Sequence, residues 1–169
     1  MAQLTTLTIK AVTNLTRAVD FGSSKHTVTV GAEQTILNGT SAGQSDLAYC
    51  DEALTIAASS NTDIDLAGSL TDPLGAAVVF ARIDAIIIKA AAGNTNNVVV
   101  GAAASNGFVG PFGASTHTIA VRPGGILALH AGSSTGWTVT AGTGDILRIA
   151  NSGAGSSVAC DVLIIGRSA

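Results

Sequence analysis

Apolar and polar residues alternate along much of this chain with a period of two, the pattern of a β-strand that has one buried face. The clearest example is segment 78–90, where the odd positions include Val79, Ile83 and Ile87 and the even positions include Asp84. We therefore expect the three aliphatic residues to face the core, and the charged residues of the segment to leave by the opposite face.

Turn residues bound the other strand candidates, each of which is rich in Val, Ile, Leu and Thr. In the C-terminal two thirds the expected strands are 78–90, 97–103, 116–122, 125–131, 136–141, 146–150 and 157–166. In the first third they are 26–37, 47–58 and 62–66. The Asn-rich connection 92–97 is expected to be a tight hairpin loop, and Pro123-Gly124-Gly125 a second turn.

The N-terminal segment 4–18 is ambiguous, because Leu4, Leu7, Ala11 and Leu15 follow helical spacing while residues 7–11 alternate like a strand. Its abundant threonine favours a strand. We expect an extended arm or a first strand over residues 1–25. We further expect the arm to reach a neighbouring subunit.

About ten short strands at spacings of about ten residues, with no long helical segment, predict an all-β fold. The expected architecture is an antiparallel β-sandwich over residues 26–169 that resembles a jelly roll. The length of 169 residues suits one such domain.

The composition narrows the class of protein. Hydrophobic residues make up 47% of the chain and charged residues only 11%, against roughly 25% charged in ordinary domains. This excludes a disordered chain, and the net charge of −3 argues against binding of nucleic acid. No membrane association is expected, since Arg82, Asp84 and Lys89 interrupt the most hydrophobic window, 76–92. The N-terminus lacks the pattern of a secretory signal.

One string matches a hydrolase motif. Residues 132–136 read Gly-Ser-Ser-Thr-Gly, which places Ser134 at the nucleophile position of G-x-S-x-G. In hydrolases the motif works at a strand-to-helix turn, but here the strand that begins at Trp137 follows it. We favour a hairpin loop and expect no enzymatic activity and no catalytic residue.

The other polar groups give no clear site. His26, His117 and His130 have no metal-ligand spacing, although the last two could approach across a hairpin at Pro123. Segment 61–65 begins like a calcium loop but has Leu66 where glycine is required, so a polar strand face is favoured. The carboxylates Asp51, Glu52 and Asp161 look isolated, which leaves glycosidase chemistry without support. We therefore expect no metal site and no cofactor.

The cysteines and aromatic residues suit structural roles. A disulfide between Cys50 and Cys160 stays open, although free thiols are favoured, and Cys160 shares an apolar face with its strand neighbours. Trp137 is expected in the core or an interface. With Tyr49 as the single tyrosine and 4% aromatic residues, the chain offers little for sugar stacking.

Several segments resemble the small β-rich virion proteins of tailed bacteriophages, over roughly residues 45–169. The segments that carry the resemblance are 63–75, 80–83, 88–95, 121–125 and 139–147, among them Asp-Ile-Asp-Leu-Ala-Gly-Ser-Leu-Thr-Asp-Pro-Leu-Gly and Val-Arg-Pro-Gly-Gly. These are turn and strand signatures, and no functional residue is carried over.

The resemblance implies a capsid decoration (cement) protein or a minor head protein on the virion surface, made in the host cytoplasm. Its partners would be the major capsid protein and further copies of itself, as a dimer or trimer. The low charge agrees, because neutral surfaces are commonly contact surfaces. The alternative is an adhesin or carbohydrate-binding module of a fibre, tail or baseplate.

Overall fold

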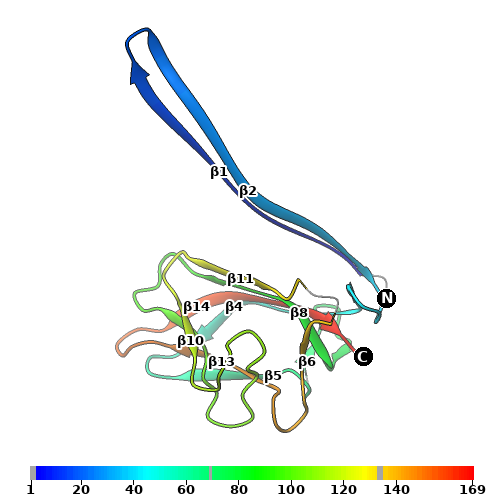
Figure 1. Cartoon of the computed structure of the whole chain (residues 1–169). Coiled ribbons are helices and arrows are strands. Elements are labelled where there is room, and N and C mark those ends of the chain that lie inside the picture. Colours follow the sequence, from blue (N-terminus) through cyan, green and yellow to red (C-terminus); the bar gives the residue numbers. More distant parts are fainter. Residues whose placement is uncertain (1–2, 69, 133–134) are drawn as a thin grey trace. The chain divides into compact units, whose positions relative to one another are not determined.

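The computed structural model describes residues 3–68, 70–132 and 135–169 (Figure 1). It divides into two compact units. One unit, here called the hairpin, is Leu4–Leu37, and the other, here called the body, is Met1–Gln3 with Asn38–Ala169. Residue 25, where the sequence suggests the end of an N-terminal arm, lies inside the second strand of the hairpin.

The hairpin consists of β1 (Leu4–Val19) and β2 (Gly22–Asn38), which pair antiparallel from Leu4↔Leu37 to Val19↔Gly22. Asp20 and Phe21 form the loop, and Gly22 follows with a φ of 121° that only glycine adopts easily. The helical spacing of 4–18 therefore has no counterpart, because threonine and β-branched residues favour the strand. The strand predicted over 26–37 is confirmed as part of β2.

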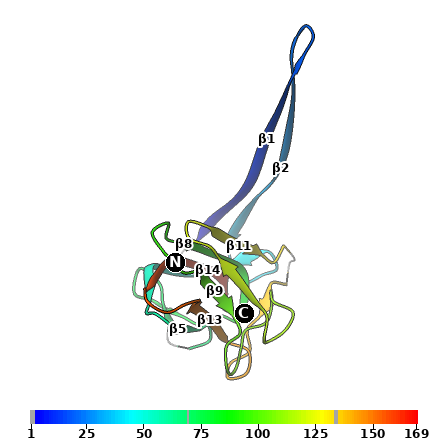
Figure 2. The ribbon, with the colours of Figure 1, turned by 90° about the vertical axis from the view of Figure 1, so that its left-hand side faces the viewer.

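The body is an antiparallel β-sandwich of two sheets, as the sequence predicts (Figures 1 and 2). One sheet has the order β10 (Thr118–Val121), β9 (Val98–Gly101), β13 (Ile146–Asn151), β5 (Asn61–Asp65). The other has the order β11 (Ile126–His130), β8 (Arg82–Ala90), β14 (Val158–Arg167), β4 (Leu47–Ile56), and β12 (Trp137–Thr138) also pairs with β8. Three short strands lie outside these two sheets: β3 (Gln44–Ser45), and β6 (Leu70–Thr71) and β7 (Ala77–Val78), which pair with each other. This strand order is compatible with jelly-roll winding.

The core of the body lies between the two sheets. Its fully buried side chains come from both, with Ile64, Val100 and Ile149 from one sheet and Ile86 and Ile164 from the other. Because each strand buries alternate residues, the inner faces together exclude water and supply the main stabilising term.

The predicted assignment of side chains to the two faces of segment 78–90 is partly wrong. Ile83 is fully buried, but Val79 is 50% exposed, Ile87 is only half-buried and Asp84 is buried. For Asp84 and Ile87 the cause is a β-bulge: β14 pairs Ile165 with Ala85 and then Gly166 with Ile83, which leaves Asp84 as an extra residue. An extra residue reverses the alternation, so even-numbered positions face inward beyond the bulge. Val79 lies outside the strands, between the end of β7 at Val78 and the start of β8 at Arg82, so strand alternation does not set its side.

The turn predicted at Pro123-Gly124-Gly125 is confirmed, because the N–H of Gly125 donates to the carbonyl of Arg122 at 2.8 Å and Gly124 has a positive φ. The hairpin loop predicted over 92–97 is wrong. Segment 92–97 joins β8 to β9, and Pro123–Gly125 joins β10 to β11, so both cross between sheets and neither is a hairpin loop. Asn94 explains the polar sequence of the first, because its side chain donates to the carbonyl of Ala159 and accepts from the N–H of Ala159, at 2.9 Å each. A turn signal identifies where the chain bends but not which strand it joins.

Candidate interaction surface

The hairpin has one apolar and one polar face. Directly opposite residues of an antiparallel pair point to the same side, so the register assigns every side chain of β1 and β2. The side called here the apolar face carries Leu7, Ile9, Ala11, Leu15, Val19, Val28, Val30, Ala32 and Ile36. Its other members are Thr5, Thr13, Arg17, Gly22, Ser24, His26 and Gln34.

Large side chains of the apolar face are exposed to solvent. Val30 is 70% exposed, Leu15 59% and Ile9 47%. At the loop, Phe21 is fully exposed. Contiguous exposed apolar surface of this kind marks an interaction site.

The opposite face is mostly polar. Thr27 donates a hydrogen bond to the side-chain oxygen of Asn14 at 2.7 Å, across the two strands. Lys10 lies beside Gly31, where a Cβ would be 3.1 Å from the Lys10 Cγ. The apolar residues on this side are Leu4, Val12, Ala18 and Leu37.

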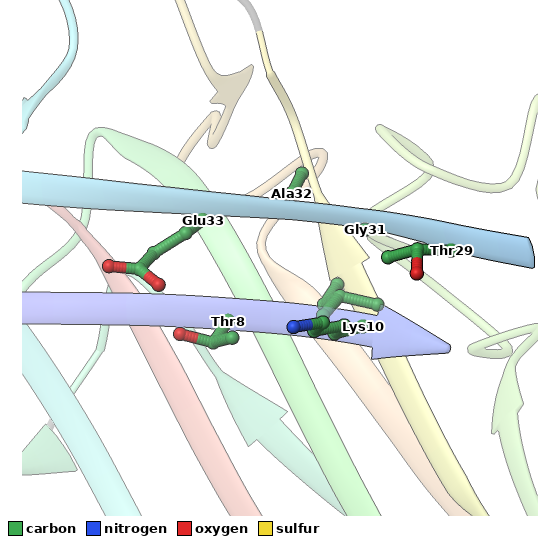
Figure 3. Close-up of a pocket in the computed structure, with 7 residues that line it drawn as sticks. Thr8, Lys10, Thr29, Gly31, Ala32 and Glu33 are labelled. Atoms are coloured by element: carbon green, nitrogen blue, oxygen red, sulfur yellow. The ribbon is translucent and has the colours of Figure 1, made fainter. Parts of the chain in front are cut away.

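A shallow hollow of about 270 Å³ lies in the middle of the hairpin (Figure 3). Figure 3 shows Thr8 and Glu33 on one side of the two strands and Ala32 on the other. The hollow is open, and the missing side chain of Gly31 contributes to it. It gives no enclosure for a small molecule, which is normally buried over most of its surface.

The area of the apolar face indicates which kind of partner it can bind. Sixteen residues of β1 at about 3.4 Å each, two strands wide, give a face of about 500 Å². An isolated two-stranded hairpin is marginally stable in water and needs packing against something else. The hairpin is therefore the candidate surface for protein–protein contact.

The hydrolase motif gains no support from its surroundings. Ser134 lies outside the described residues, and the described neighbours Gly132 and Gly136 both have positive φ. The favoured hairpin loop is wrong, because β11 and β12 both pair with β8. Within the described residues no helix follows the motif.

The three histidines lie in different places. His26 is on the hairpin opposite Leu15, and His130 is on β11 opposite Ala85. His117 precedes β10, and its Nδ1 lies 2.6 Å from the carbonyl oxygen of Phe112. The approach of His117 and His130 across a hairpin is wrong, because β10 and β11 belong to different sheets. In the described part of the chain, no group of three or more His, Cys, Asp and Glu could hold a metal ion.

Segment 61–65 is a polar strand face, as favoured. Asp63 on β5 accepts two hydrogen bonds from Arg148 on β13, at 2.7 and 2.8 Å. These bonds lower the pKa of Asp63 below its usual value. Asn61 donates a further bond to Asp63, so the carboxylate already serves the sheet.

The acidic residues of β4 and β14 are less isolated than the sequence suggests. Glu52 and Asp161 line a shallow hollow of about 450 Å³ together with Cys50 and Lys89. Asp161 accepts from the N–H of Ala53 at 3.2 Å and pairs with Lys89 at 3.5 Å. Burial, followed by the nearby carboxylates, raises the pKa of the Cys50 thiol, which makes it a poor nucleophile.

Both cysteines are free thiols, as the sequence favours. Cys160 is a core residue on β14, and burial raises the pKa of its thiol to about 11. Trp137 is half-buried and packs against the core. Tyr49 donates to Asp51 at 3.4 Å.

The sequence missed a buried ion pair. Arg167 Nη2 lies 3.2 Å from Asp84 Oδ1, with both side chains less than 8% exposed. Burial raises the pKa of Asp84, although Arg167 acts against this. Gly136 covers the pair, since a Cβ there would lie 2.7 Å from the Asp84 carboxylate. The pair joins β8 to β14 inside the body.

The sequence also missed that the apolar pattern forms one long hairpin. The signal was present, because apolar alternation runs through 7–19 and resumes over 28–36 on either side of Asp20-Phe21-Gly22. Such a turn between alternating segments is typical of a hairpin.

Comparison with protein-family models, with curated proteins and with solved structures found no match for this chain. Among the described residues, no helix is long and apolar enough to cross a membrane. The functional argument therefore depends on the hairpin and the body themselves.

Proposed function

We propose that this chain is a non-enzymatic structural protein of a tailed-bacteriophage virion, a decoration (cement) protein that bridges and stabilises major capsid subunits. The observation that carries the proposal is the hairpin with its exposed apolar face and exposed Phe21. A surface of this kind is stable only when another protein covers it.

The proposed mechanism is burial of apolar surface between proteins, with no catalysed reaction. Nine of the sixteen positions of this face are apolar, which is about 280 Å² of its area of about 500 Å². Covering that part at about 25 cal/mol per Å² gives on the order of 7 kcal/mol before the costs of association. Phe21 suits the role of an anchor, because a large aromatic side chain that enters a pocket supplies much of the energy of an interface. The partners would be the major capsid protein and further copies of this chain.

The sequence also raised a fibre, tail or baseplate adhesin. Sugar recognition would use a cluster of exposed aromatic rings. Phe21 is the one fully exposed ring among the described residues, whereas Trp137 packs against the core and the Tyr49 hydroxyl donates to Asp51. The structure thus supplies no observation that favours this alternative, and a glycan array would test it.

The proposed function is tested on phage heads that lack the protein. Adding the full chain should decorate the heads in cryo-electron microscopy and raise the temperature at which they release DNA. The Phe21→Ser variant should bind at least about tenfold more weakly, because the anchor is lost.

Leu74→Ser is the matched control, since Leu74 is also exposed, at 77%, but lies in the body. It should decorate heads like the unmodified chain. Heads that neither bind the full chain nor gain stability would refute the proposal.

A further inference from the structure

We infer that the apolar face of the hairpin binds the same face of a second copy of this chain, so that two hairpins stack face to face. The inference deepens the proposed function, on which it rests, by naming what covers this face. Phe21 at the loop is then left to meet the capsid.

The first argument is steric. Large and small residues face each other across the two strands: Ile9 is opposite Ala32, Val30 is opposite Ala11, and Val19 is opposite Gly22. In each pair the large side chain forms a protrusion and the small residue opposite it leaves a depression. The protrusion is on β1 at Ile9 and on β2 at Val30. A two-fold axis that lies between the two copies and runs parallel to the long axis of the hairpin places Ile9 of one copy over Ala32 of the other. The same axis places Val30 over Ala11. At these pairs the face is therefore complementary to itself.

The second argument is electrostatic. From Thr5 to Leu15 and from Val28 to Ile36, the apolar face holds no ionisable side chain. The same rotation lays Arg17, the strong base of this face, over Ser24 of the other copy. A second copy therefore meets no direct like-charge contact, which would oppose association.

The third argument is area. Two faces of about 500 Å² bury about 1,000 Å² in total, which reaches the lower limit for a specific interface. An interface at this limit is expected to be reversible, with a dissociation constant in the micromolar range. The polar face is unsuited to this contact, because Lys10 and Glu33 lie on it.

Sedimentation equilibrium of the full chain tests the inference without any phage component. The unmodified chain should show a concentration-dependent dimer at twice 16.6 kDa. Val30→Lys should weaken dimerisation at least about tenfold, because it places a charge in the centre of the apolar face. Thr29→Lys is the matched control: it adds the same charge one residue away on the polar face and should leave the dimer intact.

A second pair of variants guards against simple unfolding of the hairpin. Ala32→Ile adds an aliphatic contact to Ile9 within one hairpin but fills the depression that the other copy needs, so the dimer should weaken. Adding Ile9→Ala moves the protrusion to the other strand and should restore dimerisation. Circular dichroism would verify that each variant retains its strand content.

A chain that stays monomeric at all concentrations overturns the inference, as does a dimer that Val30→Lys leaves intact or that Thr29→Lys abolishes. These outcomes are separable from the proposed function. A monomer that still decorates phage heads would refute the stacking alone, whereas a dimer that ignores phage heads would refute the virion role alone.

Discussion

At the scale of single residues, the ionic groups of the body mostly serve the fold. Asp63 and Arg148 join neighbouring strands, and Asp84 with Arg167 forms a buried pair. Arg167 also donates to the carbonyl of Ser41 at 3.1 Å. With so few charges in the chain, each buried one depends on a specific partner.

Arg167→Met should destabilise the body by about 3 kcal/mol at pH 7, because it leaves a buried carboxylate without its partner. Asp84 already has a raised pKa in the folded state, and loss of Arg167 raises it further. Above the unfolded pKa of about 3.9, the folded state then binds more protons, so stability falls as pH rises. Urea melts should therefore show a smaller deficit at pH 4 than at pH 7.

The double variant Asp84→Asn with Arg167→Met is the control for this pH dependence. It has no carboxylate at position 84, so its deficit should be nearly the same at both pH values. An Arg167→Met deficit that grows toward low pH would contradict the assignment.

At the scale of elements, the bulge in β8 decides which side chains enter the core. It depends on Gly166 of β14, where a Cβ would lie 2.1 Å from the carbonyl oxygen of Arg82. Alternation in the sequence gives the face of a strand only up to such a break. This is why the assignment is correct for Ile83 and wrong for Ile87 and Asp84, whereas Val79 lies before β8 begins and follows no strand alternation.

Gly166→Ala should cost at least about 2 kcal/mol of stability, because the added methyl forces β8 and β14 apart at the bulge. The matched control is Gly93→Ala, since a Cβ at Gly93 meets nothing within 4 Å. Its effect should stay within about 0.5 kcal/mol. Thermal and urea melts measure both, and equal effects would show that the bulge tolerates a side chain.

At the scale of the whole molecule, the chain combines a body that has its own core with a hairpin that has none. The body buries aliphatic residues from both sheets, whereas β1 and β2 hold exposed ones. The body is expected to fold alone, and the hairpin is expected to depend on a partner.

Replacing residues 4–37 by an Asn-Gly turn should leave the body folded, with a free energy of unfolding within about 1 kcal/mol of the full chain. The ends to be joined are adjacent, because Gln3 donates its N–H to the Asn38 side chain at 3.0 Å. Urea melts and circular dichroism give the measurement. A shortened chain without a cooperative transition would show that the body needs the hairpin.

The sequence by itself determined the all-β class, the approximate position of the longer strands of the body and the core role of Cys160, because these follow from local alternation, propensity and turn residues. Only the tertiary structure decided that β8 and β14 meet at a bulge, that segments 92–97 and 123–125 cross between sheets, and that Asp84 pairs with Arg167. The bulge, the inter-sheet connections and the ion pair each depend on contacts between residues far apart along the chain. A local sequence pattern does not determine which distant strand becomes the neighbour.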